Sequence, residues 1–175
     1  MQLFWDKLSA THDKTGFESG VKELDEYLKT QANQDVKRNL SSVFVLADKN
    51  GRIVGYYAIS QYSLTVEEFP EQASKKLPLK RRVACTLLGR LAVDKRYQGQ
   101  GYGEELLFHA LNKALVISKE IASFAIIVDA KDEKAKRFYQ KYDFISLKDM
   151  PFRLYIPMKG LEQKLNLSSV QATQN

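Results

Sequence analysis

The pattern of hydrophobic and polar positions in the first third of the chain predicts a helix followed by a β-hairpin. Between residues 20 and 34, apolar side chains recur every three or four positions, with charged residues between them. This spacing is typical of an amphipathic helix. Two β-prone runs, 43–46 and 53–60, flank the turn from Asp48 to Gly51, and this arrangement predicts a hairpin. The apolar positions of the helix are Val21, Leu24, Leu28 and Ala32.

Strands and helices alternate in the rest of the chain. Residues 65–82 hold two prolines and a basic run, so we expect a mobile connector with a short helix there. The unbroken apolar run over 83–93 is typical of a strand buried on both faces. The elements expected after it are a helix over 101–118, a strand over 124–128, a helix over 132–140 capped by Asp132, and strands over 144–147 and 152–158.

This order of elements predicts one mixed α/β domain, and the length of 175 residues fits a single domain with its own core. We expect the domain to cover residues 1–160 and a polar C-terminal tail to cover 161–175, in which Ser168 to Asn175 should fray. The N-terminal stretch has charges inside its short apolar segment, and no window reaches the length of a membrane span. We therefore expect a cytoplasmic protein.

Composition adds a charge argument and excludes some kinds of site. Lys and Arg number 27 against 21 Asp and Glu, which gives a net charge of +6 and a pI near 9.3. This balance favours an anionic partner, whether a nucleic acid, a membrane surface or a phosphorylated cofactor. The single cysteine, Cys85, excludes an intramolecular disulfide. Because His12 and His109 are the only histidines, no metal site is expected.

The sharpest chemical signal is a glycine-rich loop between the buried strand and the next helix. The loop has three glycines in five residues, so its backbone is able to approach a ligand closely, and the helix N-terminus favours an anion such as pyrophosphate. A dinucleotide fingerprint is excluded because it requires glycine where Glu104 stands, and the Gly-Lys-Ser/Thr of a P-loop is absent. A tight strand-to-helix turn is the alternative. The loop reads Gln98-Gly99-Gln100-Gly101-Tyr102-Gly103.

Two sets of residues resemble known families. Gln98-x-x-Gly101-x-Gly103, after Leu91-Ala92-Val93, resembles the acyl-CoA-binding motif of the GCN5-related N-acetyltransferase (GNAT) superfamily, and the order of elements extends this resemblance over nearly the whole chain. A second set is similar to the acetyltransferase toxins of bacterial toxin–antitoxin pairs. It comprises Gly89 to Asp94, the Gly-Gln-Gly loop, Val128-Asp129-Ala130, Ala135 with Phe138-Tyr139, and matches from Asp13 to Leu28.

The resemblance implies the GNAT fold, in which a mixed central sheet is flanked by helices and acetyl-CoA is the co-substrate in the cleft between the central strands. It implies an N-acetyltransferase toxin that acetylates the α-amine of aminoacyl-tRNA and so blocks translation, with a ribbon-helix-helix antitoxin and a homodimer as its assemblies. One departure is Asp143, where the family commonly has glycine. Aspartate tolerates the left-handed conformation better than most residues, so we expect the turn to form.

The resemblance also implies roles for individual residues. Tyr139 corresponds to the family's general acid, while packing beside Phe138 on an amphipathic helix is the alternative. The strand is expected to hydrogen-bond the pantetheine arm, and its amide near Val93 to contact the oxyanion. The residues assigned to acetyl-CoA are Leu91, Ala92, Val93, Gln98, Gly99, Gln100, Gly101, Tyr102 and Gly103.

The chemistry of the acceptor agrees with an α-amine substrate. A lysine side chain has a pKa near 10.4 and needs a base, whereas a peptide-type α-amine titrates near about 7.7 to 8.0 and an aminoacyl ester lower still. A useful fraction is therefore neutral without a histidine base. Cys85 is a rival nucleophile, but buried cysteines in apolar runs are usually inert. Glu23, Asp25 or Glu26 could touch the amine, although solvated helix charges explain them equally well.

The basic run Lys80, Arg81 and Arg82 is expected to bind tRNA phosphates, with solvated surface as the alternative. A second basic segment, from Lys131 to Lys141, alternates with acidic residues and reads more readily as solvated surface. Two other functions stay open. One is an acetyltransferase of a small amine or a protein N-terminus, and the other is a non-catalytic module that binds CoA or RNA.

Overall fold

The computed structural model describes the backbone of residues 1–172 and the side chains up to Asn166. The chain forms two compact units. The first comprises Met1–Ser60 and Leu88–Ala110, and the second comprises Gln61–Leu87 and the described residues from Leu111 onwards. The expected fraying of Ser168 to Asn175 falls on positions whose side chains, and at the end whose backbone, lie outside the described residues.

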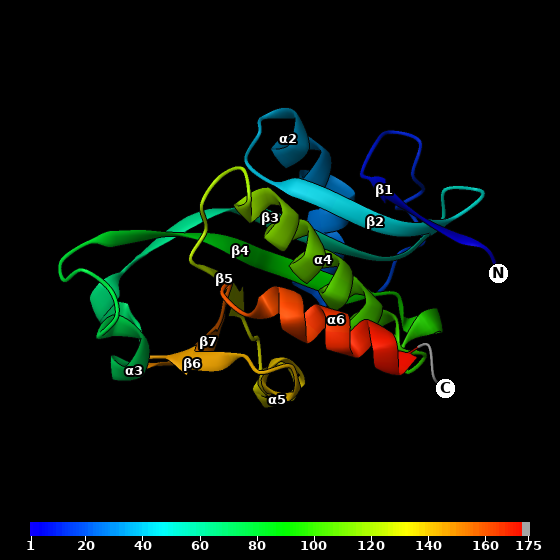
Figure 1. The fold of residues 1–175 in the computed structure, drawn as a ribbon. Helices are drawn as coiled ribbons and strands as arrows, with labels where there is room; N and C mark the ends of the chain where they lie inside the picture. Colours follow the sequence, from blue (N-terminus) through cyan, green and yellow to red (C-terminus); the bar gives the residue numbers. More distant parts are fainter. Residues whose placement is uncertain (173–175) are drawn as a thin grey trace. The chain divides into compact units, whose positions relative to one another are not determined.

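Seven strands form a sheet in the order β1-β2-β3-β4-β5-β7-β6 (Figure 1). β1 pairs antiparallel with β2 and β2 with β3, while β7 pairs antiparallel with both β5 and β6. With its helices, this sheet confirms the predicted mixed α/β fold. The strands are β1 (Leu3–Lys7), β2 (Ser42–Asp48), β3 (Ile53–Thr65), β4 (Arg82–Val93), β5 (Ala125–Asp129), β6 (Ile145–Leu147) and β7 (Met150–Pro157).

The helices follow the predicted order, with additions. The hairpin, the long strand β4 and the helix after the glycine-rich loop form as expected, and the Asp132 carboxylate caps α5 by accepting a hydrogen bond from the Ala135 amide at 2.8 Å. The helices are α1 (Lys22–Glu26), α2 (Ala32–Lys37), α3 (Glu71–Ser74), α4 (Tyr102–Ser118), α5 (Glu133–Lys141) and α6 (Leu161–Ala172), with the π-helix η1 (Tyr27–Gln31) and the 3₁₀ turns η2 (Val66–Glu68) and η3 (Lys95–Tyr97).

The predicted single helix over 20–34 is interrupted by a wide turn. The Ala32 amide donates to the Tyr27 carbonyl, five residues back, which defines η1 between α1 and α2. The hydroxyl of Thr30 donates to the Glu26 carbonyl at 2.7 Å, and such local side-chain bonds compete with the regular helical pattern. The wider turn keeps Tyr27, Leu28 and Ala32 buried, so the hydrophobic pattern is satisfied although the helix is not regular.

Two elements were not expected from the pattern. β1 contains two charged residues in five, and it forms because it pairs along its full length with β2, from Leu3 opposite Asp48 to Lys7 opposite Phe44. α6 forms in the predicted polar tail, where Leu161 is buried and Lys164 bonds the carboxylate of Asp143 at 2.9 Å. Both elements depend on tertiary contacts that a local pattern does not contain.

The connector before β4 contains the short helix that the sequence predicts. Thr65 and Glu68 form a reciprocal capping box at η2, and the Val66 amide donates to the Arg81 carbonyl at 3.1 Å. Val66 and Phe69 are fully buried in the second unit, where they anchor this segment. The mobility of the connector stays a prediction.

The first unit has a core between the sheet and the α1–α2 region, and Figure 1 shows α2 against β2. Gly55 on β3 is required by the close approach of α4. A Cβ atom there would lie 2.7 Å from a Leu106 methyl and 3.0 Å from the Ala92 carbonyl oxygen. The core residues include Phe17, Tyr27, Leu28, Val45, Tyr56 and Ala92.

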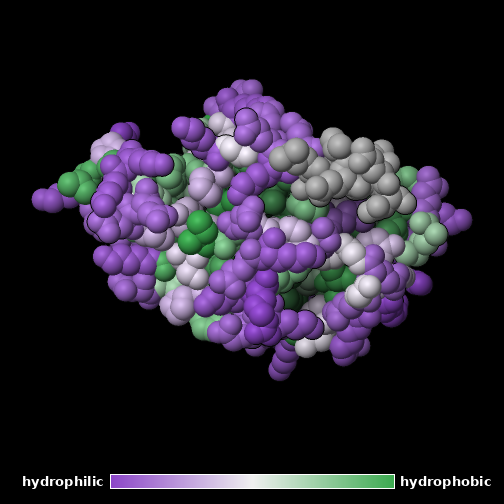
Figure 2. All heavy atoms as spheres, turned by 60° about the horizontal axis from the view of Figure 1, so that its bottom comes forward, coloured by the Kyte–Doolittle hydropathy of each residue, from purple (hydrophilic) through white to green (hydrophobic). Residues whose placement is uncertain are grey.

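The second unit has its own buried cluster, built on β5 and β7. Phe69 packs edge-to-face on both Phe124 and Tyr155, with ring centroids 5.3 and 5.1 Å apart. Cys85 and Ile127 lie in the same cluster. The face drawn in Figure 2 is mainly hydrophilic, with apolar side chains gathered only in small groups. Among the described residues, no helix has the length and apolar character needed to cross a membrane.

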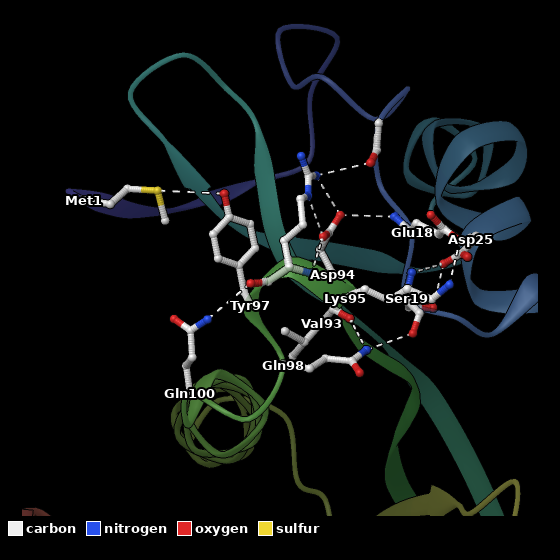
Figure 3. A network of polar contacts seen from close by, with 12 residues as sticks. Met1, Glu18, Ser19, Asp25, Val93, Asp94, Lys95, Tyr97, Gln98 and Gln100 are labelled. Atoms are coloured by element: carbon white, nitrogen blue, oxygen red, sulfur yellow. Dashed lines mark hydrogen bonds and ion pairs between the residues drawn. The ribbon is translucent and has the colours of Figure 1, made fainter.

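The buried carboxylate of Asp94 fixes the end of β4, where the glycine-rich loop departs (Figure 3). One oxygen accepts from the Arg96 amide at 3.0 Å and its Nε at 2.8 Å, and the other accepts from Arg96 Nη2 at 2.8 Å and the Glu18 amide at 3.1 Å. The Asp94 amide donates to the Val54 carbonyl at 2.9 Å. Burial alone would raise the Asp94 pKa, but the Arg96 and amide hydrogen bonds outweigh it and lower that pKa.

We expect Asp94→Asn to lower the free energy of unfolding by about 2–3 kcal/mol at neutral pH, because it removes charge-assisted hydrogen bonds from a buried site. The folded-state pKa lies below the unfolded value of about 3.9, so the stabilisation is complete above that pH and is lost as the pH falls through the folded-state pKa. Urea denaturation of both proteins over a pH series measures the difference, which should shrink in acid.

The matched control is Glu71→Gln, which breaks an exposed ion pair with Lys75 on α3. Exposed pairs of this kind contribute at most about 0.5 kcal/mol. If Asp94→Asn and Glu71→Gln have equally small effects at neutral pH, the Asp94 network does not hold the structure together.

Candidate active site

The glycine-rich loop follows Asp94 and η3, and two of its glycines adopt the left-handed conformation. Gly99 has φ +75° and Gly101 has φ +87°. Apart from the chain neighbours, no atom of the described residues lies within 4 Å of a Cβ atom added at either position, so the described structure leaves space open beside the loop. Gly103 has ordinary helical geometry, and its added Cβ would lie 4.0 Å from Val93. The backbone conformation therefore requires glycine at 99 and 101 but not at 103.

The two glutamines of the loop turn their side-chain amides back onto the protein. Gln98 Nε2 donates to the Ser19 carbonyl at 2.8 Å and to the Val93 carbonyl at 2.9 Å (Figure 3). Gln100 Nε2 donates to the Arg96 carbonyl at 3.2 Å. Both side chains shape the loop, so the groups that it presents to a ligand are mainly backbone amides.

These amides stand at the N-terminus of α4. The Glu105 amide donates to the Gly101 carbonyl at 3.1 Å, which is the first helical bond of this element. The amides before Glu105 belong to the first turn, which has no intrahelical acceptors, and the helix dipole adds a partial positive charge there. The loop is solvent-exposed from Gln98 to Gly101. This arrangement is chemically suited to bind a diphosphate.

The strand residues assigned to the pantetheine arm lie in the same unit as the loop. Ala92 and Val93 are buried, and Leu91 is half-buried. The structure therefore brings Leu91 to Gly103 together as a strand, a bend held by Asp94, and an exposed glycine-rich turn. Tyr139 and the basic run Lys80 to Arg82 belong to the second unit.

Tyr139 lies on α5, where it is 8% exposed. Burial first, and the charge of Asp129 second, raise the pKa of its phenol, so the hydroxyl keeps its proton at neutral pH. The ring packs edge-to-face on Phe138 and lies beside Phe144. The Tyr139 hydroxyl makes no hydrogen bond to any described residue, so its proton remains available to a bound molecule. Packing and proton donation are thus compatible in this side chain.

Next to this helix, Asp143 adopts φ +67°. The expectation that aspartate supports the turn where the family commonly has glycine is confirmed. The turn is closed by the Phe144 amide, which donates to the Tyr139 carbonyl at 3.3 Å.

Cys85, the rival nucleophile, and the two histidines are held by packing and hydrogen bonds within the protein. Cys85 is buried, and burial raises the pKa of its thiol to about 11, which keeps it protonated and unreactive. His12 accepts a hydrogen bond from the Ser9 amide through Nδ1 at 3.1 Å. His109 stacks on Trp5 with ring centroids 3.7 Å apart, and its Nδ1 lies 2.9 Å from the Tyr57 hydroxyl. No group of three potential metal ligands occurs in the described part of the chain.

The basic run is only partly engaged. Arg82 donates to the hydroxyl and carbonyl of Ser63 at 2.8 to 3.1 Å, and the Lys80 amide donates to Glu67 at 3.0 Å. Arg81 and Arg82 also line a cavity of about 630 Å³ in the second unit, together with Phe124 and Lys159. The Arg82 guanidinium is thus fixed by Ser63, whereas the bond of Lys80 comes from its backbone amide.

Sequence reasoning did not identify the polar anchor of the loop. Glu18 and Ser19 are far from the motif in sequence, yet Lys95 bonds Glu18 through its amide and its ammonium, each at 2.7 Å. The sequence did contain one signal for this anchor. Asp94 directly follows a buried strand, and an aspartate in this position is a typical cap for the turn that follows. Nothing in the sequence pattern pointed to its partners.

Comparison with known proteins adds a family assignment. A family model described as an acetyltransferase (GNAT) domain matches residues 12–159. A tRNA-acetylating toxin of Mycobacterium tuberculosis is 34% identical over 153 residues, which covers 87% of this chain and 90% of that protein. A solved structure of AtaT complexed with acetyl-methionyl-tRNAfMet has a TM-score of 0.86 and 27% identity, and the match covers 93% of this chain and 98% of that one.

A second AtaT structure is a tyrosine-to-phenylalanine mutant bound to acetyl-CoA and to the C-terminus of the antitoxin AtaR. Its TM-score is 0.79 at 25% identity, over 92% of this chain and 96% of that one. The matched family model spans both units described above, including the strand, the loop and the helix with Tyr139. The protein belongs to the acetyltransferase (GNAT) family.

Proposed function

We propose that this acetyltransferase is the toxin of a type II toxin–antitoxin system, and that it transfers an acetyl group from acetyl-CoA to the α-amine of aminoacyl-tRNA. The observation that carries the proposal is the exposed anion-binding loop at the start of α4, in a chain 34% identical to a tRNA-acetylating toxin. N-acetylated aminoacyl-tRNA has no free α-amine for peptide-bond formation, so translation is inhibited.

In this proposal the loop amides from Gln98 to Gly103 hold the CoA pyrophosphate. The exposed loop and the unpaired first turn of α4 support this assignment. Leu91, Ala92 and Val93 align the pantetheine arm, and the amide near Val93 contacts the oxyanion. The anionic part of the cofactor is thus bound mainly by backbone dipoles, and few lysine or arginine side chains are needed for it.

The reaction is a direct attack of the neutral α-amine on the thioester carbonyl. The nitrogen forms a bond to the carbonyl carbon, the tetrahedral intermediate collapses, and the carbon–sulfur bond breaks. Tyr139 gives a hydrogen bond and then a proton to the departing thiolate. The nitrogen of the intermediate releases one proton to solvent, and the Tyr139 phenolate takes one proton from solvent, so the protons balance. The raised pKa of Tyr139 keeps the phenol in its donor form throughout the neutral pH range.

We further propose the assemblies and the location that this function requires. The partner is an antitoxin, which the relative bound to the C-terminus of the antitoxin AtaR supports, and the resemblance implies that this antitoxin is of the ribbon-helix-helix class. The acting form is a homodimer, and the protein works in the cytoplasm, where aminoacyl-tRNA is available. The basic run Lys80, Arg81 and Arg82 contributes binding to tRNA phosphates.

Incubation with labelled acetyl-CoA and total aminoacyl-tRNA tests the activity. We expect label in the aminoacyl-tRNA and none in polyamines or peptide N-termini. Tyr139→Phe should lower kcat by about 100-fold or more without changing the KM for acetyl-CoA, because the variant loses only the proton donor. Tyr142→Phe at the end of the same helix serves as the control and should retain activity. Label in free amines but not in tRNA would rule out the proposed substrate.

The loop assignment is tested by comparing two glycines with the same conformation. Gly101 and Gly160 both have positive φ and open space where a Cβ would be placed. Alanine at either position should cost about 1–2 kcal/mol of stability. Only Gly101→Ala should weaken acetyl-CoA binding, by about 10-fold or more, because it alters the amide cradle. Calorimetric titration measures the affinity, and equal affinities for the two variants would contradict the assignment.

The basic run is tested by the triple substitution Lys80→Gln, Arg81→Gln and Arg82→Gln. We expect weaker use of aminoacyl-tRNA, and a salt dependence of kcat/KM whose logarithmic slope is smaller by about two. Acetyl-CoA affinity should stay the same. A second triple variant, with glutamine at Lys131, Lys134 and Lys136, removes the same charge from another segment. If both triple variants behave alike, net charge explains the effect and this run has no special role.

A further inference from the structure

Arg90 occupies a defined position on β4, directly before the strand residues assigned to the pantetheine arm. Its guanidinium carbon lies 3.6 Å from the centroid of the Tyr27 ring, a close cation–π contact. The side chain is half-buried. Arg90, Tyr27 and Leu91 all belong to the first unit.

The Arg90 guanidinium has no acceptor among the residues that the structure describes. It makes no hydrogen bond or ion pair with any residue that the structure describes. Asp25 is a nearby carboxylate, because its charge and that of Arg90 both act on the pKa of Tyr56. It accepts hydrogen bonds from the amide and the hydroxyl of Ser19 at 2.8 and 2.6 Å. A planar guanidinium that is partly desolvated and lacks a partner is suited to bind a phosphate or carboxylate bidentately.

Tyr27 is built as a fixed platform for this cation. It is 1% exposed and begins the π-helix η1, and its ring stacks on Tyr56 at 6.3 Å between centroids. The Tyr56 hydroxyl donates to the Leu24 carbonyl at 2.7 Å, and this hydrogen bond holds the Tyr56 ring in place. The Tyr27 hydroxyl is buried and has no hydrogen-bond partner in the described part of the chain, so this residue contributes the face of its ring.

The direction of the bound cofactor, which rests on the proposed function, indicates which anion Arg90 would meet. The diphosphate lies at the loop from Gln98 to Gly103, and the pantetheine arm runs back along Val93 to Leu91. At about 3.3 Å per strand residue, Arg90 stands about 10 Å before Val93, beyond the thioester and away from the CoA phosphates. In the proposed complex, this leaves the side of the thioester next to Arg90 for the acceptor amine.

We propose that Arg90 binds the phosphodiester on the 5′ side of the aminoacylated 3′-terminal nucleotide, and that Tyr27 is the positioning residue that holds its guanidinium. This phosphodiester is the negative charge nearest to the aminoacyl ester in the acceptor. The contact anchors the last nucleotide of the tRNA end, so the α-amine is held at the thioester carbonyl.

A substrate pair that differs in this one charge tests the proposal. We compare aminoacyl-tRNA carrying the natural terminal linkage with the same tRNA carrying a neutral methylphosphonate there. For the wild-type protein, kcat/KM should fall by about 10- to 100-fold with the neutral linkage, as expected for loss of a charge-assisted hydrogen bond. Arg90→Gln should lose a similar factor with the natural substrate, mainly through KM, and should show no further loss with the neutral one.

Controls separate this role from stability and from cofactor binding. Acetyl-CoA affinity and the thermal midpoint of Arg90→Gln should match the wild type. Tyr27→Phe should act like the wild type because it keeps the ring, whereas Tyr27→Leu should raise the KM for aminoacyl-tRNA.

Each remaining outcome contradicts a specific statement. Equal wild-type rates on the two linkages, or an equal linkage effect in Arg90→Gln, would overturn the role of Arg90 and leave the proposed function intact. Weaker acetyl-CoA binding in Arg90→Gln would place the contact on the cofactor phosphates instead. If the wild-type protein acetylates no aminoacyl-tRNA, the proposed function fails, and the role of Arg90 falls with it.

Discussion

The carboxylate of Asp94 joins three parts of the first unit that are distant in sequence. It accepts hydrogen bonds from Arg96 and from the Glu18 amide, while its own amide bonds β3 through Val54. A buried carboxylate is stable only when such donors replace its water. The end of β4 is therefore held in one position, and Gln98 extends the same anchoring by bonding Ser19 and Val93. The glycine-rich loop starts from this fixed point, which pre-organises it for a ligand.

Some charged side chains of the protein form ion pairs with other residues of the chain, and others do not. Arg96 and Arg153 are paired with Asp94 and Asp129, so they contribute to structure. In the loop, backbone amides supply the positive potential, and no lysine or arginine stands between Gln98 and Gly103. Under the proposed function, the net charge of +6 is therefore available to a larger polyanion such as tRNA.

Much of the site was predictable because its signals are local. The apolar run of β4, the glycines at 99 and 101 and the periodicity of α4 each follow from neighbouring residues, as does the Asp132 cap. Other features were not predictable. The strand β1 depends on pairing with β2, and η1 interrupts a pattern that reads as one regular helix. In α6, the buried Leu161 and the Lys164–Asp143 contact stabilise a segment that looks polar in sequence.

The sequence by itself determined the class of fold and the left-handed glycine-rich loop, because periodicity and glycine spacing act over a few residues, whereas Tyr139 was named as a general acid only through the family resemblance. Only the tertiary structure decided which side chains anchor the loop and that Arg90 stacks on Tyr27 without an acceptor among the described residues. Glu18 and Asp94 are 76 residues apart in sequence, and Tyr27 and Arg90 lie on an early helix and a later strand. Such partners are chosen by the packing of the α1–α2 region against the sheet, a long-range constraint that no local pattern contains.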